Sequence, residues 1–221
     1  RDGYGEIVVS LLPFLKPVQV RQFYPDEKIE TYQDAMQTVL RHSPVDPAKR
    51  NVLLCHQFIT GAEQSDSEEK TVGGLDNIDA AVFDDFDYVA LGHIHKPQRV
   101  MRDSLRYAGS IMKYSFSEVN HRKSVTIVEM GEKGKIALHA VPLHAPHDVR
   151  KVEGMFDEVM CMERSEDYVW ITLFIGIGAV GGALCMLIKP DGSIMGMDGM
   201  LPYFQVLPFA DVLFQDFTFS G

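Results

Sequence analysis

The chain has 221 residues, of which 46% are hydrophobic and 24% are charged, a composition typical of one globular domain or slightly more. Its net charge of −10 argues against a protein that binds nucleic acid through bulk electrostatics, because neutralising phosphates requires lysine and arginine. Any chemistry on nucleic acid would therefore depend on local cations, such as bound metal ions.

The three cysteines lie far apart in the sequence and have no C-x-x-C spacing, so they indicate neither a disulfide framework nor a zinc site. The first residue is arginine rather than methionine, and no basic stretch followed by an apolar run indicates a signal peptide. We therefore expect a cytoplasmic protein whose sequence is truncated at its start.

The first segments predict a strand region followed by a helix. Residues 6–15 form an apolar run that Pro13 interrupts, which is typical of one or two strands meeting at an irregular turn. From Tyr32 to Leu40 the apolar residues recur at helical spacing, and the prolines at 44 and 47 close the segment. We therefore expect one helix here.

Two short apolar runs predict buried parallel strands. Val52–Cys55 is followed by His56, and Tyr88–Leu91 is followed by Gly92 and His93. Such continuous runs are typical of strands that are covered on both faces. A polar loop and a short amphipathic piece at 78–83 lie between the runs, so the unit reads strand, crossover, strand and predicts an α/β layer architecture.

The later segments change character. Residues 124–130 and 135–141 are rich in strand-forming residues and flank a Gly-Glu-Lys-Gly turn, which predicts an antiparallel hairpin. Residues 152–162 have the apolar spacing of a helix, and residues 167–173 favour another strand.

Three histidines are the candidates for chemistry. Ligands collect beyond the carboxyl ends of strands in open α/β sheets, where His56 and His93 are predicted to lie. His93 and His95 share a face in extended backbone, with Ile94 packed behind them and Gly92 leaving room for a metal ion. A single histidine after a strand is more often a hydrogen-bonded core or rim residue, so spacing alone leaves both interpretations open.

The remaining histidines have neither strand-end nor paired placement. We expect solvent-exposed or hydrogen-bonded roles for them. They are His42, His121, His139, His144 and His147.

Several sequence blocks occur together and in order. They are Cys55–Phe58, Val72–Asp76, Tyr88–Gln98 with its G-H-x-H motif, Tyr107–Ser110 with its Y-x-G-S motif, and Lys113–Glu118. Together they resemble the SbcD family of calcineurin-like phosphoesterases, collinearly over about residues 1–173, and several motifs in order are far more specific than any one of them.

The resemblance implies an α/β fold, the C-terminal half of a four-layer metallophosphoesterase β-sandwich flanked by helices. Residues 1–143 would form the partial phosphoesterase domain and residues 144–173 the start of an SbcD-like cap domain. Residues 174–221 are not matched and form an unassigned hydrophobic segment, which looks joined on from elsewhere.

The resemblance also implies a two-metal site, with Mn²⁺ as the usual ion. By position, His56 and His93 would bind one metal and His95 its neighbour. The activity implied is cleavage of DNA, by 3′-to-5′ exonuclease and by hairpin- or end-opening endonuclease action in DNA repair, recombination and replication. The implied partners are DNA, the SbcC ATPase and a second copy of the chain.

The sequence departs from the family pattern at one important point. The D-x-H, G-D and G-N-H-D motifs, which supply the bridging aspartate, an asparagine ligand and the general-acid histidine, have no counterpart in these residues. No catalytic residue is therefore assigned. Three neutral imidazoles divided between two metals bind weakly, so we expect this chain alone to be inactive or impaired.

The C-terminal part supports two alternatives. Residues 169–188 are uncharged and mainly apolar, long enough for a membrane-spanning helix, with Gly178 and Gly182 at G-x-x-x-G spacing. Membrane association and simple burial are both open, and a non-catalytic remnant with a membrane- or partner-associating tail is the main alternative function. Residues 176–181 match G-x-G-x-x-G, but too little chain follows for a nucleotide-binding oxidoreductase, so we treat the match as accidental.

Overall fold

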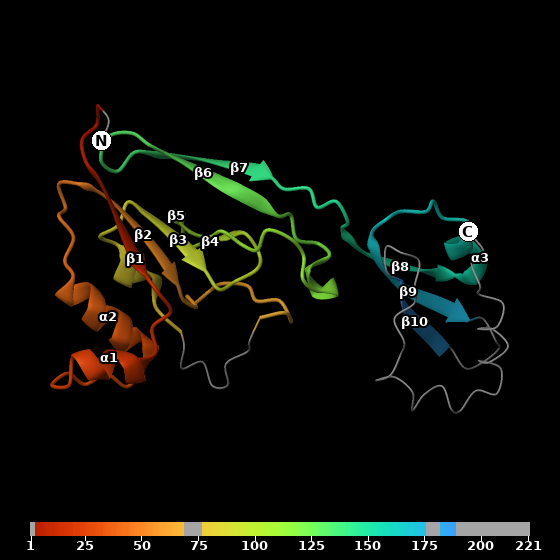
Figure 1. Ribbon diagram of the computed structural model, residues 1–221, viewed down its shortest axis with the longest axis horizontal. Coiled ribbons are helices and arrows are strands. Elements are labelled where there is room, and N and C mark those ends of the chain that lie inside the picture. The colour runs from red at the N-terminus through yellow and green to blue at the C-terminus, as the bar shows by residue number, and fades with distance from the viewer. Residues whose placement is uncertain (1–2, 69–76, 176–181, 189–221) are drawn as a thin grey trace. The chain divides into compact units, whose positions relative to one another are not determined.

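A computed structural model describes residues 3–68, 77–175 and 182–188 of the chain. It divides into two compact units, Arg1–His144 and Ala145–Gly221, and each is described by itself (Figure 1).

The first unit is built on a five-stranded sheet with the order β1-β2-β3-β5-β4. Strands β1, β2, β3 and β5 are parallel to one another, and β4 pairs with β5 in the antiparallel direction. The α/β class with a parallel sheet is confirmed, and it is consistent with a metallophosphoesterase fold. The strands are β1 (Ile7–Leu12), β2 (Arg50–His56), β3 (Tyr88–Gly92), β4 (Gln98–Val100) and β5 (Arg102–Tyr107).

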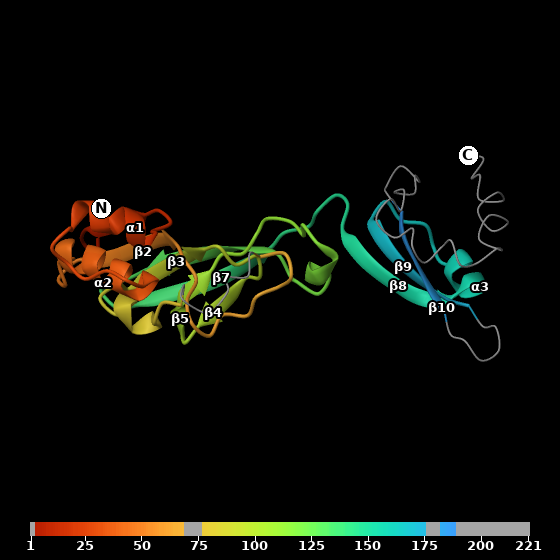
Figure 2. The same ribbon diagram turned by 90° about the horizontal axis from the view of Figure 1, so that it is seen from below.

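Two helices, α1 (Pro17–Phe23) and α2 (Tyr32–His42), separate β1 from β2 and lie side by side in both views (Figures 1 and 2). The predicted helix is α2, and Thr31 caps it by accepting a hydrogen bond from the backbone N–H of Asp34. Helix α1 was not predicted. Its sequence signal is Pro17 at the first helical position, where a proline is well tolerated.

The main core lies between the sheet and the segments that connect its strands. Met36 of α2 packs against buried side chains of β2 and β3, and Phe83 of the short 3₁₀ helix η1 (Ala80–Phe83) closes the crossover between those strands. The opposite face of the sheet is more open among the described residues: Leu11 is 73% exposed and Leu54 is 41% exposed. The prediction that the strand at 52–55 is covered on both faces is therefore wrong at Leu54.

The hairpin consists of β6 (Ser124–Met130) and β7 (Ile136–Pro142), paired in the antiparallel direction as predicted, and is drawn in green in Figure 1. Its turn is fastened to the sheet by Asp87, which precedes β3. Asp87 accepts hydrogen bonds from the Lys133 ammonium at 2.8 Å, the Gly134 N–H at 3.2 Å and the Asn51 N–H at 2.6 Å. One carboxylate thus connects the hairpin turn with β2.

The second unit contains a three-stranded sheet with the order β10-β9-β8 and a short helix, α3 (Phe156–Met160). Its strands are β8 (Val149–Met155), β9 (Tyr168–Ile175) and β10 (Gly182–Ile188). The predicted strand at 167–173 is confirmed as part of β9. The helix predicted at 152–162 is wrong for residues 152–155, because they belong to β8 and pair with β9.

Of the two alternatives left open for residues 169–188, the membrane-spanning helix is not supported. Residues 169–175 and 182–188 are strands that pair with each other in the antiparallel direction, so their backbone hydrogen bonds run between segments rather than along a helix. Across the ranges that the structure describes, no helix is both long and apolar enough to cross a membrane. The G-x-G-x-x-G match at 176–181 lies outside the described residues.

We predict that Asp87→Ala destabilises the first unit by about 1–3 kcal/mol at neutral pH, because the Asn51 N–H loses its buried carboxylate acceptor. Burial acts to raise the pKa of Asp87, but hydrogen bonds from Lys133 and Asn51 outweigh it and hold the pKa below its usual value of 3.8. The carboxylate therefore stabilises the fold above pH 3.8 and loses this effect as the pH falls below that value.

Urea denaturation of the wild type and the variant should show the largest difference at neutral pH and a smaller one at about pH 3. Asp85→Ala, which changes an exposed carboxylate two residues away, is the matched control and should have little effect at either pH. An equal difference at both pH values for Asp87→Ala would contradict the ionic role.

Candidate metal centre

His56 and His93 lie at the carboxyl ends of two neighbouring parallel strands. The strand register pairs His56, the last residue of β2, with Gly92, the last residue of β3, and His93 follows directly. The centroids of the two imidazole rings are 5.5 Å apart, and the rings are nearly perpendicular, at 84°. The structure thus brings together two histidines that lie far apart in the sequence.

The backbone at the end of β3 allows the two imidazoles to lie close together. A Cβ atom at residue 92 would lie 2.6 Å from Nδ1 of His56, so the glycine leaves room for the imidazole ring of His56. The sequence predicted that Gly92 leaves room for a metal ion. In the structure, the glycine instead leaves room for the imidazole of His56, a candidate ligand of that ion. His93 has a φ of 102°, a conformation that costs a non-glycine residue on the order of 1–3 kcal/mol and is often found at functional sites.

Aromatic side chains pack against the two imidazoles. Phe14, from the loop after β1, lies parallel to the ring of His93 at 6.1 Å and edge-on to that of His56 at 6.3 Å. The ring centroid of Phe58 lies 6.4 Å from that of His93. These contacts restrict the orientation of both rings, and Phe14 was not recognised in the sequence because it lies inside a general apolar run.

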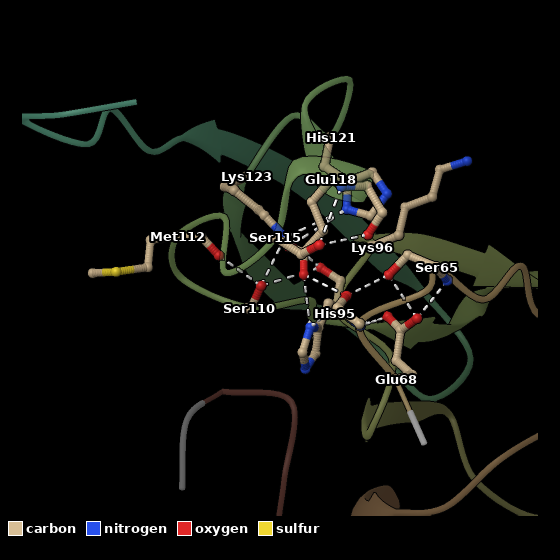
Figure 3. Close-up of polar contacts among 12 residues, drawn as sticks. Ser65, Glu68, His95, Lys96, Ser110, Met112, Ser115, Glu118, His121 and Lys123 are labelled. Carbon is tan, nitrogen blue, oxygen red and sulfur yellow. Dashed lines mark hydrogen bonds and ion pairs between the residues drawn. The ribbon is translucent and has the colours of Figure 1, made fainter. Parts of the chain in front are cut away.

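His95 lies in a polar cluster with Glu118 and Lys123 (Figure 3). Ser67 belongs to the same cluster through its hydrogen bond with Glu118. The ring Nδ1 of His95 is 2.9 Å from Oε1 of Glu118, whose side chain is fully buried. Ser67 donates to the same carboxylate oxygen at 2.6 Å, and the Lys123 ammonium donates to the other oxygen, Oε2, at 2.6 Å. The structure therefore gives His95 its own set of partners, distinct from the contact between His56 and His93.

The charge state of the cluster follows from these contacts. Burial acts to raise the pKa of Glu118, but hydrogen bonds from Lys123, Ser67 and His95 lower it to about 2. The glutamate is therefore ionised at neutral pH, and the Lys123 ammonium lies beside it as the compensating charge.

The Y-x-G-S block holds two segments, the one that follows His56 and the one that carries His95. The hydroxyl of Tyr107 donates to the backbone carbonyl of Gln57 at 2.8 Å and accepts from the N–H of Ile59 at 2.8 Å. Gly109 has a φ of +77°, and a Cβ there would lie 2.5 Å from Pro97. The N–H of Ser110 donates to the carbonyl of His95 at 3.0 Å. Each of the motif residues in Tyr107–Ser110 that the resemblance singled out thus has a structural role near the histidines.

Sequence reasoning missed the partners of His95. Glu118 closed one of the matched blocks but had no assigned role, and Lys123 lay outside all of them. His121 was expected to be solvent-exposed or hydrogen-bonded, and the hydrogen-bonded role is confirmed: its side chain is 10% exposed, and its Nδ1 lies 3.5 Å from the Lys123 ammonium and 3.8 Å from Oε2 of Glu118. The hydrogen-bonded role is confirmed for His42, which contacts Glu27, and for His147, which contacts the carbonyl of Glu166.

The part of the chain that the structure describes supplies only part of a donor set for metal ions. In the described ranges, no three or more His, Cys, Asp or Glu side chains are grouped so that they could hold a metal ion. The His56–His93 pair offers two imidazoles, and His95 offers a third at a separate place. The side chain of Cys55, next to His56 in the sequence, is buried in the main core, and burial raises the pKa of its thiol to about 12. The residues present therefore fit a partial site that other groups must complete.

We predict that Tyr107→Phe destabilises the fold by about 1–3 kcal/mol, because the buried N–H of Ile59 and carbonyl of Gln57 both lose their partner. Tyr24→Phe is the matched control: its ring stacks on His42, and that contact survives loss of the hydroxyl. Thermal unfolding of the two variants and the wild type measures the loss of stability in each variant. Equal melting temperatures would show that the Tyr107 hydroxyl contributes nothing.

No family model matches the chain. Among curated proteins, it is 36% identical over 152 residues to the D subunit of the SbcCD nuclease of Staphylococcus epidermidis, covering 67% of this chain and 41% of that protein. It is 32% identical over 159 residues to the protein of the same name from Staphylococcus saprophyticus, covering 71% of this chain and 42% of that protein. The matched region thus spans about two fifths of the length of these relatives. The family predicted from the motifs is therefore confirmed: over about 70% of its length, this chain is SbcD-like and homologous to the D subunits of SbcCD nucleases.

Proposed function

We propose that this chain forms part of the phosphoesterase domain of an SbcD-like nuclease that hydrolyses phosphodiester bonds of DNA with the help of metal ions. The observation that carries the proposal is the meeting of His56 and His93 at adjacent strand ends, in a chain homologous to proteins named as nuclease subunits. Their placement at the carboxyl edge of a parallel sheet is the usual place for a ligand site in such sheets.

In this proposal His56 and His93 hold one metal ion and His95 holds a neighbouring one, with Mn²⁺ as the ion. When bound, a metal pair supplies an activated water molecule and stabilises the charge that develops on the phosphoryl oxygens. The chain's own contribution is to hold the imidazoles. Phe14 packs against both rings of the first pair, and Glu118 contacts the third ring.

The same proposal assigns DNA as the substrate and an SbcC-like ATPase as the partner, with 3′-to-5′ exonuclease and hairpin- or end-opening endonuclease activities for the whole protein. The net charge of −10 supports a mechanism in which metal ions provide the positive charge that meets the phosphates. The relatives are named as one component of an SbcCD nuclease, and this name supports the assignment of the partner.

These 221 residues alone should be inactive or strongly impaired. They contain no D-x-H, G-D or G-N-H-D motif, so they provide neither the bridging carboxylate nor the general-acid histidine of the family. Imidazoles without an anionic partner hold divalent ions weakly, because the charge of the ions is then not compensated.

We predict weak Mn²⁺ binding by this chain, measurable by calorimetry, and a loss of affinity of at least about tenfold in His56→Ala and His93→Ala. His139→Ala removes an imidazole that is 58% exposed on the hairpin and is the matched control, with unchanged affinity expected. A nuclease assay with short duplex DNA should detect no cleavage by the chain alone.

Two results would contradict the proposal. Equal Mn²⁺ affinity in the wild type, His56→Ala and His93→Ala would remove the metal role of the strand-end pair. Cleavage of DNA by the chain alone, retained in His93→Ala, would show that the hydrolytic centre lies elsewhere.

A further inference from the structure

We propose that Glu118 is a positioning residue for His95: it fixes the ring with Nδ1 protonated, so that the lone pair of Nε2 is presented to a metal ion. This inference deepens the proposed function and rests on it for the identity of the ligand. The arrangement of hydrogen bonds around the ring is observed independently of any metal ion.

Glu118 contacts His95 as a hydrogen-bond acceptor, as the contacts around its carboxylate show. The Lys123 ammonium has three protons, and its three shortest contacts are with Oε2 of Glu118 at 2.6 Å, the hydroxyl of Ser110 at 2.7 Å and the carbonyl of His95 at 2.8 Å. Nδ1 of His121 lies farther away, at 3.5 Å. Ser67 donates to Oε1 of Glu118. Both oxygens of Glu118 therefore act as acceptors, and Nδ1 of His95, at 2.9 Å from Oε1, is the donor.

The backbone of His95 is held from both sides as well. Its N–H donates to Oε1 of Glu68 at 2.8 Å, and its carbonyl accepts from the N–H of Ser110 and from Lys123. The main chain cannot shift without breaking these bonds, so the orientation of the ring depends on the contacts of the ring itself. The shortest of these joins Nδ1 to Oε1 of Glu118 at 2.9 Å, and the hydroxyl of Ser67 lies 3.3 Å from the same nitrogen.

The remaining ring nitrogen is available. Figure 3 shows one nitrogen of His95 facing Glu118 and the other pointing away from the cluster. The side chain is 31% exposed, so a ligand can reach it. A histidine that donates one N–H to a carboxylate and offers the other nitrogen is the usual arrangement of a metal-binding imidazole, in which the carboxylate fixes the tautomer and strengthens the ligand.

The variant Glu118→Gln tests this directly, because it keeps the shape and changes the donors. Lys123 still needs an acceptor, so the amide oxygen should take the place of Oε2 and the NH₂ group should face His95. An NH₂ group that faces Nδ1 needs it as an acceptor, so we expect the proton to move to Nε2, which removes the lone pair from the outward side of the ring.

The experiment is ¹⁵N NMR of the histidine side chains in the full 221-residue chain without metal. We expect the Nδ1–H tautomer for His95 in the wild type and the Nε2–H tautomer in Glu118→Gln. Mn²⁺ affinity at His95 should fall by roughly 10–100-fold in the variant. Glu68→Gln is the matched control: it alters a buried glutamate that contacts the backbone N–H of His95 rather than its ring, and the tautomer should stay unchanged.

An Nε2–H tautomer in the wild type would overturn the inference, and so would an unchanged Nδ1–H tautomer in a folded Glu118→Gln variant. If the Glu118→Gln variant does not fold, the tautomer of His95 in the wild type still tests the inference. The expected tautomers, combined with no Mn²⁺ binding by the wild type, would support the positioning role and contradict the proposed metal site, so the two failures are distinguishable.

Discussion

Parallel pairing of β2 with β3 is the constraint on which the candidate site depends. The register places His56 opposite Gly92, so the two strands end together and their following residues meet at one edge of the sheet. This register is set by burial, because shifting a strand by one residue would turn Leu53 and Cys55 out of the core. The crossover through Phe83 makes the parallel direction possible and supplies part of that core. The pairing of the two imidazoles is therefore a consequence of packing beneath them.

The second support of the site is ionic rather than apolar. Lys123 and Glu118 are almost completely buried, and such a pair is stable only when its remaining donors and acceptors are satisfied. Here every proton of the ammonium has an acceptor, and those acceptors belong to Glu118 itself and to the segments that carry His95 and Ser110. The pair thus joins the loop after β3, the loop after β5 and the residues before β6. Hydrogen bonds in such a cluster fix the orientation of a side chain, which apolar contacts do not. A nitrogen that binds a ligand needs this fixed orientation, because its lone pair must point at the ligand.

The local parts of the fold were readable from the sequence. Helix α2 has its own cap at Thr31 and an apolar stripe, and the hairpin has its own turn, so neighbouring residues indicate where each of these elements lies. The short apolar runs before His56 and His93 predicted buried parallel strands, because a continuous apolar run is typical of a strand that other elements cover. The motifs also identified the family, and one motif glycine has a clear structural role: a Cβ at Gly109 would collide with Pro97.

What the sequence by itself determined was the α/β class, the family and the three candidate histidines. Only the tertiary structure decided how those histidines are grouped, because the partner of His95 is Glu118, 23 residues away, and Phe14 reaches His93 from the loop after β1. The tertiary structure also decided the secondary structure of residues 152–155, 169–175 and 182–188, which are strands. Their apolar residues are compatible with a helix, but backbone pairing among β8, β9 and β10 selects strands, and such pairing joins residues that local periodicity does not connect.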